Sequence, residues 1–220
     1  MVELIRGLDP ARVRANLLEV REEIDAAARR AARHPAEVEI VAATKYVALD
    51  ELGALAEAGV AVVGENRAQD LRAKRERWGE IFAWDFIGHL QSRKVKAILR
   101  DVRLVHSVAS DSVLGQLGRH GSPDTEVLVE VNLAGEESKS GIAPEQLDGF
   151  LARSPVRVTG LMAMPPPSDD PEESRPFFAR LRELGVERGL ARLSMGTTQD
   201  FVVAVEEGST LVRIGTRLYR

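Results

Sequence analysis

A lysine follows a run of residues that otherwise reads as a buried strand. In VEIVAATKYV, Val38, Ile40 and Val41 predict the strand, and Lys45 stands at its end. An apolar surrounding disfavours the ammonium form of a lysine, and the free amine can then attack a carbonyl carbon. We therefore predict that Lys45 forms a Schiff base. The alternative is a side chain that extends past the strand end into water.

Lysine is rare in this chain, which uses arginine as its ordinary cation. Of the 30 basic residues only five are lysines, namely Lys45, Lys74, Lys94, Lys96 and Lys139. An arginine cannot be deprotonated to act as a nucleophile, whereas a lysine can. The choice of lysine at position 45 is therefore consistent with amine chemistry.

Two segments near the C-terminus, LSMGTTQD and VRIGTRLY, predict an anion site. Ser194 and Gly196 in the first, and Gly215 and Thr216 in the second, combine hydroxyl groups with a backbone that can approach a phosphate closely. Either segment alone could be only a turn at the end of a strand. Together, and after the last two predicted strands, they favour a phosphate site.

An aldehyde-capturing lysine and a phosphate site together predict pyridoxal 5′-phosphate (PLP) as the cofactor. PLP sites commonly add an acidic or arginine partner for the pyridine nitrogen, and Arg213 is the candidate. The alternative for Arg213 is an ordinary surface or loop-pairing arginine. We expect Asn66 and Met195 to line the same pocket.

The remaining polar residues at strand ends carry weaker signals. His89 and His106 could act in acid–base chemistry, but isolated histidines of this kind are more often structural. We expect Met162 and Met164 to serve packing. No set of histidines and carboxylates has metal-ligand spacing, and no G-x-S-x-G motif is present, so neither a metal site nor a serine hydrolase is predicted.

The elements that must position these residues alternate along the chain. Asp9-Pro10 and the apolar spacing after it predict a helix over 9–33. Eight β-rich runs follow, at 38–46, 60–66, 84–90, 103–110, 125–134, 157–164, 191–196 and 210–216. Amphipathic segments separate them, at 49–58, 67–78, 92–100, 111–120, 144–153, 171–185 and 198–207, and the highly charged 67–78 is expected to be a solvated outer helix.

This alternation predicts the α/β class and parallel strands. An open doubly wound sheet is the alternative, but the first strand is not followed by G-x-G-x-x-G. We predict a (β/α)8 TIM-type barrel with an extra N-terminal helix, forming a single domain over residues 1–220. Sites of such barrels lie at the C-terminal ends of the strands, where the residues above would converge.

Composition narrows the class of protein. The chain has 220 residues, no cysteine and a net charge of −4. The lack of cysteine excludes disulfides and thiolate metal sites and agrees with a cytoplasmic location. Charges of both signs are interspersed and no run approaches the roughly 20 apolar residues of a membrane span, so we expect neither nucleic acid nor a membrane as partner.

The motifs, taken in order, resemble the pyridoxal phosphate homeostasis protein family. They are VAATKYV, GENRAQD, WDFIGHLQSRKVK, VHSV, VLVEVNLAGEESKSGI, GLMAM, LSMGTTQDF and GSTLVRIGTRLY, and they extend from about residue 8 to the last residue. The resemblance implies a barrel like the N-terminal domain of alanine racemase. It implies that Lys45 carries PLP, that Ser194, Gly215 and Thr216 hold its phosphate, and that Arg213 faces the pyridine nitrogen.

The chain departs from the family pattern at the edge of the expected pocket. Arg67 in GENR replaces a common aromatic residue, and Thr197 and Gln199 replace a common methionine and aspartate. Lys45, Ser194 and the RIGT segment are intact, so the resemblance still implies cofactor binding.

The same resemblance implies binding of PLP rather than a defined reaction. Members are described as supplying the cofactor, which suggests apo forms of PLP-dependent enzymes as partners, and a lone barrel predicts a monomer. An arginine at the pyridine nitrogen weakens the ring as an electron sink. Racemisation also needs a second base, and Tyr46 is expected to point away from Lys45.

We therefore expect a PLP carrier in vitamin B6 homeostasis. A PLP-dependent amino-acid racemase of weak or narrow activity is the alternative. A Schiff-base aldolase with a sugar-phosphate substrate and a purely structural barrel are the other hypotheses.

Overall fold

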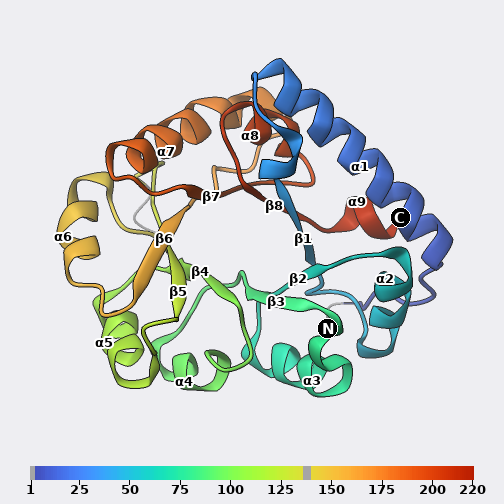
Figure 1. Ribbon diagram of the computed structural model, residues 1–220, viewed down its shortest axis with the longest axis horizontal. Coiled ribbons are helices and arrows are strands. Elements are labelled where there is room, and N and C mark those ends of the chain that lie inside the picture. Colours follow the sequence, from blue (N-terminus) through green and yellow to red (C-terminus); the bar gives the residue numbers. More distant parts are fainter. Residues whose placement is uncertain (1–2, 136–139) are drawn as a thin grey trace.

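Eight parallel strands close into a barrel in the part of the chain that this computed structural model describes, residues 3–135 and 140–220 (Figure 1). Lys139 lies outside the described residues. Each strand pairs with the next one in sequence, and β1 pairs with β8 to close the ring. The strands are β1 Glu39–Ala43, β2 Val62–Glu65, β3 Ala83–Phe86, β4 Leu104–Val108, β5 Glu126–Glu130, β6 Arg157–Met162, β7 Arg192–Thr197 and β8 Leu211–Ile214. The prediction of a (β/α)8 barrel is confirmed.

Helices surround the barrel and cover the outer faces of its strands (Figure 1). They bury apolar side chains such as Leu55, Leu71 and Leu117 against the strands. Their bounds are α2 Leu52–Ala58, α3 Ala68–Trp78, α4 Val95–Ile98, α5 Asp111–His120, α6 Leu147–Ala152, α7 Arg175–Glu187, α8 Phe201–Glu206 and α9 Thr216–Tyr219.

The extra N-terminal helix is also confirmed, as α1 Pro10–Arg30. The Asp9 side chain accepts a hydrogen bond from the Ala11 N–H at 3.0 Å, which caps a helix whose first residue is proline. One face of α1, including Val20 and Ile24, is buried, and the helix packs against α2, α8 and α9 (Figure 1). The predicted end at residue 33 was three residues too late.

Several strands are shorter than the apolar runs that predicted them. The run 84–90 corresponds to β3, which ends at Phe86, and the run 125–134 corresponds to β5, which ends at Glu130. Leu90 and Val131 are nevertheless buried, because the loops after these strands pack against the core. Apolar residues in the loops that follow the strands therefore led the sequence pattern to predict strands that are too long.

The barrel interior is part apolar and part polar. Its apolar side chains are Val41, Val62, Leu104, Leu128, Met162 and Leu211, so the packing role expected for Met162 is confirmed. Asp85 from β3, His106 from β4, Ser194 from β7 and Arg213 from β8 are also buried. Buried polar groups require partners, so the contacts of these four residues decide what the interior can do.

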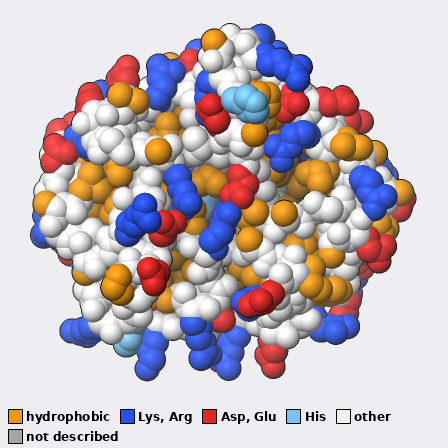
Figure 2. Space-filling view, viewed as in Figure 1, with side chains coloured by type: hydrophobic (Ala, Val, Ile, Leu, Met, Phe, Trp, Pro, Cys, Tyr) orange, Lys and Arg blue, Asp and Glu red, His pale blue; other side chains and the backbone are white. Residues whose placement is uncertain are grey.

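Charged side chains of both signs are interspersed over the face seen in Figure 2, with hydrophobic side chains exposed between them. On this face no area carries one sign of charge only. Among the described residues, no helix has the length and apolar character that crossing a membrane requires.

Candidate functional site

A cavity of about 460 Å³ opens at the C-terminal ends of the barrel strands. Most of its lining residues follow β1, β2, β3, β6, β7 or β8, and Ala43, Thr197 and Arg213 belong to the strands themselves. This is the end of a (β/α)8 barrel at which ligand sites are built. The polar groups on its wall include those of Lys45, Asn66, Thr198, Arg213, Gly215 and Thr216.

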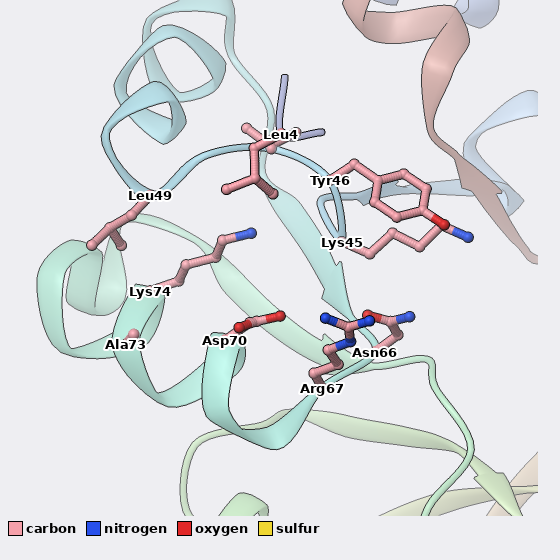
Figure 3. Close-up of a pocket in the computed structure, with 10 residues that line it drawn as sticks. Leu4, Lys45, Tyr46, Leu49, Asn66, Arg67, Asp70, Ala73 and Lys74 are labelled. Atoms are coloured by element: carbon pink, nitrogen blue, oxygen red, sulfur yellow. The ribbon is translucent and has the colours of Figure 1, made fainter. Parts of the chain in front are cut away.

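Lys45 lies in the turn after β1 and its side chain is exposed at the edge of this cavity. The expectation of an apolar surrounding was wrong, because the turn carries the residue beyond the packed end of the strand. The Lys45 Nζ lies 4.8 Å from the centre of the Tyr46 ring, and the two side chains run side by side (Figure 3). The expectation that Tyr46 points away from Lys45 was therefore also wrong, since side chains alternate only within a strand.

A buried ion pair fixes the residue before Lys45. The Lys74 Nζ donates to Glu65 Oε1 at 2.5 Å and to the carbonyl oxygen of Thr44 at 2.8 Å. The Thr44 hydroxyl also donates to Glu65 Oε1, at 2.6 Å. Lys74 is 5% exposed and Glu65 is fully buried, so the expectation of a solvated outer helix over 67–78 was wrong at Lys74.

The arrangement around Lys74 explains why this position holds a lysine. A compact ammonium group can donate to two acceptors in a small buried space, whereas a planar guanidinium needs a wider one. The sequence offered one signal, the scarcity of lysine, but nothing in it paired Lys74 with Glu65 or Thr44. The N-terminal segment braces the same turn, because the Ile5 N–H donates to the Tyr46 carbonyl at 2.7 Å.

Arg213 lies on β8, the strand that pairs with β1, and lines the same cavity as Lys45. Arg213 is 5% exposed, and its Nη2 donates to the carbonyl oxygen of Ala163 at 3.0 Å. Its Nε and Nη1 have no hydrogen-bond partner among the described residues. Burial lowers the pKa of Arg213 to about 10, opposed by the charges of Glu130 and Asp200. A buried cation with free donors on a cavity wall is suited to a ligand acceptor.

The loops after β7 and β8 meet at the cavity and supply hydroxyl groups. The Gly215 N–H donates to Thr198 Oγ1 at 3.1 Å, which joins the two loops, and Thr216 is exposed beside them. Asp200 holds the first loop, since it accepts from the Thr197 N–H at 2.7 Å. Gly196, near the end of β7, has φ = 90°, and a Cβ there would lie 2.5 Å from the Ala204 Cβ, so only glycine fits.

Ser194 and Met195, two residues predicted to contact the cofactor, lie elsewhere. Ser194 is fully buried in the barrel, with Oγ 2.8 Å from His106 Nδ1. The Met195 side chain packs in the core between the barrel and its helices. Neither residue lines the cavity described above. Sequence reasoning missed Thr198, although the repeated hydroxyls of GTTQD were available as a signal.

The Ser194 hydroxyl belongs to a buried chain of polar groups. His106 Nε2 lies 3.1 Å from Asp85 Oδ2, and Arg103 donates to the same carboxylate at 2.8 and 3.0 Å. Burial lowers the pKa of His106. Burial alone would raise the pKa of Asp85, but the hydrogen bonds from His106 and Arg103 lower it. Neutral His106 therefore donates from Nε2 to Asp85 and accepts from Ser194 at Nδ1. These contacts are those of a buried structural residue, as expected for His106.

Other side chains at the cavity include Tyr219, His89 and Met164. Tyr219 is buried and its hydroxyl donates to the carbonyl oxygen of Ala43 at 3.1 Å. His89 is exposed at the cavity, and Met164, which was expected to be packed, is 56% exposed there. Within residues 3–135 and 140–220, no group of three or more histidines and carboxylates could hold a metal ion.

The chain was compared with known proteins. No family model matches it. It is 38% identical over 217 residues to a pyridoxal phosphate homeostasis protein of Aquifex aeolicus, with 92% of this chain and 95% of the relative covered. It is 37% identical over 214 residues to a protein of the same name from Pseudomonas aeruginosa, with 93% of each covered.

A solved structure of a PLP-binding protein is also similar to this chain. PipY of Synechococcus elongatus, whose structure is described with PLP bound, superposes with a TM-score of 0.79 at 26% identity. The superposition covers 94% of this chain and all of PipY. The likeness therefore extends over nearly the whole barrel.

Proposed function

The chain belongs to the pyridoxal phosphate homeostasis protein family, and we propose from this premise that it binds PLP as a Schiff base on Lys45 and acts as a carrier of the cofactor. Recipients would be apo forms of PLP-dependent enzymes. The proposal places this role in the cytoplasm, with the protein acting as a monomer.

The cavity fits the three groups by which PLP is recognised. Lys45 offers the amine for the aldehyde. Arg213 offers the free donors Nε and Nη1 for the pyridine nitrogen. Thr198, Gly215 and Thr216 offer hydroxyl and backbone groups for the phosphate. The free donors of buried Arg213, in one cavity with an exposed lysine, are the observation that carries the proposal.

The residues favour binding over catalysis. PLP supplies an aldehyde that captures amines and a ring that can withdraw electrons. Arg213 keeps its charge at neutral pH and disfavours a proton on the pyridine nitrogen, which weakens that withdrawal. Tyr46 runs alongside Lys45, so the two groups are not placed on opposite faces of a ligand, as racemisation requires (Figure 3).

The direct test is to incubate the protein with PLP, record the absorption spectrum, reduce with borohydride and map the adduct by peptide mass spectrometry. The proposal expects a yellow protein with a pyridoxyl group on Lys45. A protein that takes up no PLP would contradict it and leave the aldolase hypothesis. Exchange of α-deuterium from an L-amino acid by the loaded protein would instead support the racemase.

Thr198→Val should weaken PLP binding about tenfold, because it removes a hydroxyl expected to contact the phosphate while keeping the side-chain shape. Affinity for pyridoxal, which lacks the phosphate, should change little. Equilibrium dialysis with both compounds measures the difference.

Ser194→Ala is the matched control for Thr198→Val, since Ser194 was predicted from the sequence to hold the phosphate but is bonded to His106. We expect it to leave the ratio of PLP to pyridoxal affinity unchanged. If Ser194→Ala lowers that ratio and Thr198→Val does not, the assignment of Thr198 is wrong.

Arg213→Met should leave the PLP-free protein as stable as the unsubstituted protein or stabilise it by about 1–2 kcal/mol, because it removes a buried cation with two free donors. It should weaken PLP binding at least tenfold, since those donors are assigned to the ring nitrogen. Urea unfolding without PLP and dialysis with PLP measure the two effects separately.

The control for Arg213→Met is Arg103→Met, which leaves the buried Asp85 carboxylate without its arginine partner. We expect this control to lower the free energy of unfolding by about 3 kcal/mol. A large loss of stability in Arg213→Met without PLP would show that Arg213 serves the fold rather than a ligand.

A further inference from the structure

A second hollow, of about 780 Å³, lies beside Lys45 and is shown in Figure 3. It runs between α3, the turn after β1 and the N-terminal segment. We call it the α3 groove. Lys45, Tyr46 and Asn66 line both the α3 groove and the cavity proposed for PLP, so the two are continuous at the Lys45 side chain.

The α3 groove combines apolar walls with charged groups of both signs. Leu4 and Leu49 are two of the exposed large hydrophobic side chains, at 44% and 36% exposure, and both face it. Arg67 and Asp70 lie on its α3 side. Arg67 stands at the boundary with the PLP cavity, and its guanidinium lies beside the Asn66 side chain and points toward Lys45 (Figure 3).

Two groups at this boundary lack a partner. The Arg67 guanidinium is exposed and makes no hydrogen bond or ion pair with another of the described residues. The Asn66 Oδ1 is buried and has no hydrogen-bond partner among them either. Lys74 also lines the groove, but Glu65 and Thr44 hold its ammonium group. Arg67 is therefore the arginine of the α3 groove that is available to a ligand placed next to Lys45.

The chemistry of these groups defines a ligand. A guanidinium matches a carboxylate, with which it forms two parallel hydrogen bonds. The negative charge of Asp70 three residues along disfavours a ligand that carries only an anion and favours one that also has an ammonium group. Leu4 and Leu49 provide apolar surface for a side chain. These features together describe a free amino acid.

Resting on the proposed function, we propose that the α3 groove seats a free amino acid with its carboxylate on Arg67, and that PLP leaves Lys45 by exchange onto this amine. The nitrogen of the amino acid forms the new C=N bond to the aldehyde carbon while the bond to the Lys45 Nζ breaks. An amino acid seated as its ammonium form first releases one proton to water. The two hydrogens that remain on its nitrogen then end on Lys45, so no further reactant is needed. Arg67 is a specificity-determining residue in this scheme, because it selects amines that carry a carboxylate.

The experiment mixes the PLP-loaded protein with L-alanine or with L-alaninamide at equal concentrations of the neutral amine. The pyridoxyl adduct left on Lys45 after borohydride reduction is quantified against time. We expect exchange with alanine to be about threefold faster than with the amide, the size of effect typical of an ion pair at an exposed site. Arg67→Gln should abolish this preference and leave the PLP affinity within about twofold.

Arg72→Gln is the matched control, since Arg72 is an exposed arginine of α3, the helix that follows Arg67, and does not line the α3 groove. It should keep the preference for alanine. Equal rates for the two amines in the unsubstituted protein, or a preference that survives Arg67→Gln, would overturn the proposal. Failure to load PLP on Lys45 would instead contradict the proposed function.

A second readout needs no PLP. Saturation-transfer NMR on the PLP-free protein should detect binding of L-alanine more strongly than binding of L-alaninamide. Arg67→Gln should remove the difference and Arg72→Gln should keep it. Equal signals from both compounds in the unsubstituted protein would count against a carboxylate site at Arg67.

Discussion

Lys45→Ala protein should carry no covalently bound PLP after incubation with the cofactor and borohydride reduction. Lys45 is the exposed amine that lines the cavity shared with Arg213, and an alanine cannot form the C=N bond. Arg213 and the loops with Thr198 and Gly215 are unchanged in this variant. We therefore expect weak, reversible PLP binding to remain, with an absorption spectrum like that of the free aldehyde.

Lys96→Ala is the control for this substitution, because Lys96 is an exposed lysine of α4 that does not line the cavity. It should load PLP as the unsubstituted protein does. Lys45→Arg should behave like Lys45→Ala, since a guanidinium is not deprotonated at neutral pH. A pyridoxyl adduct of full yield in Lys45→Ala, found on Lys74 of the adjoining α3 groove, would show that the anchor is misassigned.

Lys74→Met should lower the free energy of unfolding by about 3–5 kcal/mol, because it leaves the carboxylate of Glu65 buried without its counter-charge. The Thr44 carbonyl loses a hydrogen bond in the same variant. Urea unfolding of the PLP-free protein measures the loss. Since Thr44 precedes Lys45, we also expect slower formation of the Schiff base, measured by stopped-flow absorbance.

A double-substituted protein separates the stability lost through the unpaired charge of Glu65 from the stability lost through altered packing. Combining Glu65→Gln with Lys74→Met removes both charges, and we expect it to recover at least half of the stability lost in Lys74→Met. Arg180→Met is the control, because the Arg180–Glu183 pair is exposed and should contribute less than about 1 kcal/mol. Equal losses in Lys74→Met and Arg180→Met would show that the buried pair does not stabilise the fold.

Position within β7 explains why the sequence misplaced part of the site. The predicted strand ended at Gly196, with Ser194 near its end, whereas β7 extends to Thr197. Side chains alternate along a strand. Ser194 therefore points into the barrel toward His106 and Met195 points outward into the core. Thr198, the first residue after the strand, lines the cavity instead of Ser194.

The sequence by itself determined the barrel and several of the residues that meet at its open end. Alternating apolar runs and amphipathic segments require parallel strands, and parallel strands in a closed ring bring all their C-terminal ends to one side. For that reason Lys45, Arg213 and Gly215, read from separate strand ends, line one cavity in the structure. Their spacing along the chain was sufficient to place them together.

Only the tertiary structure decided which groups are free and which are already paired. Lys74 looked like one charge on a solvated helix, yet the packing of α3 against β2 places it on Glu65 and Thr44. Arg67 looked similar and faces Lys45 without a partner among the described residues (Figure 3). Hydrogen bonds between residues distant in sequence depend on side-chain directions across several elements. No local pattern of residues encodes those directions, because burial and pairing are set by the whole packed structure.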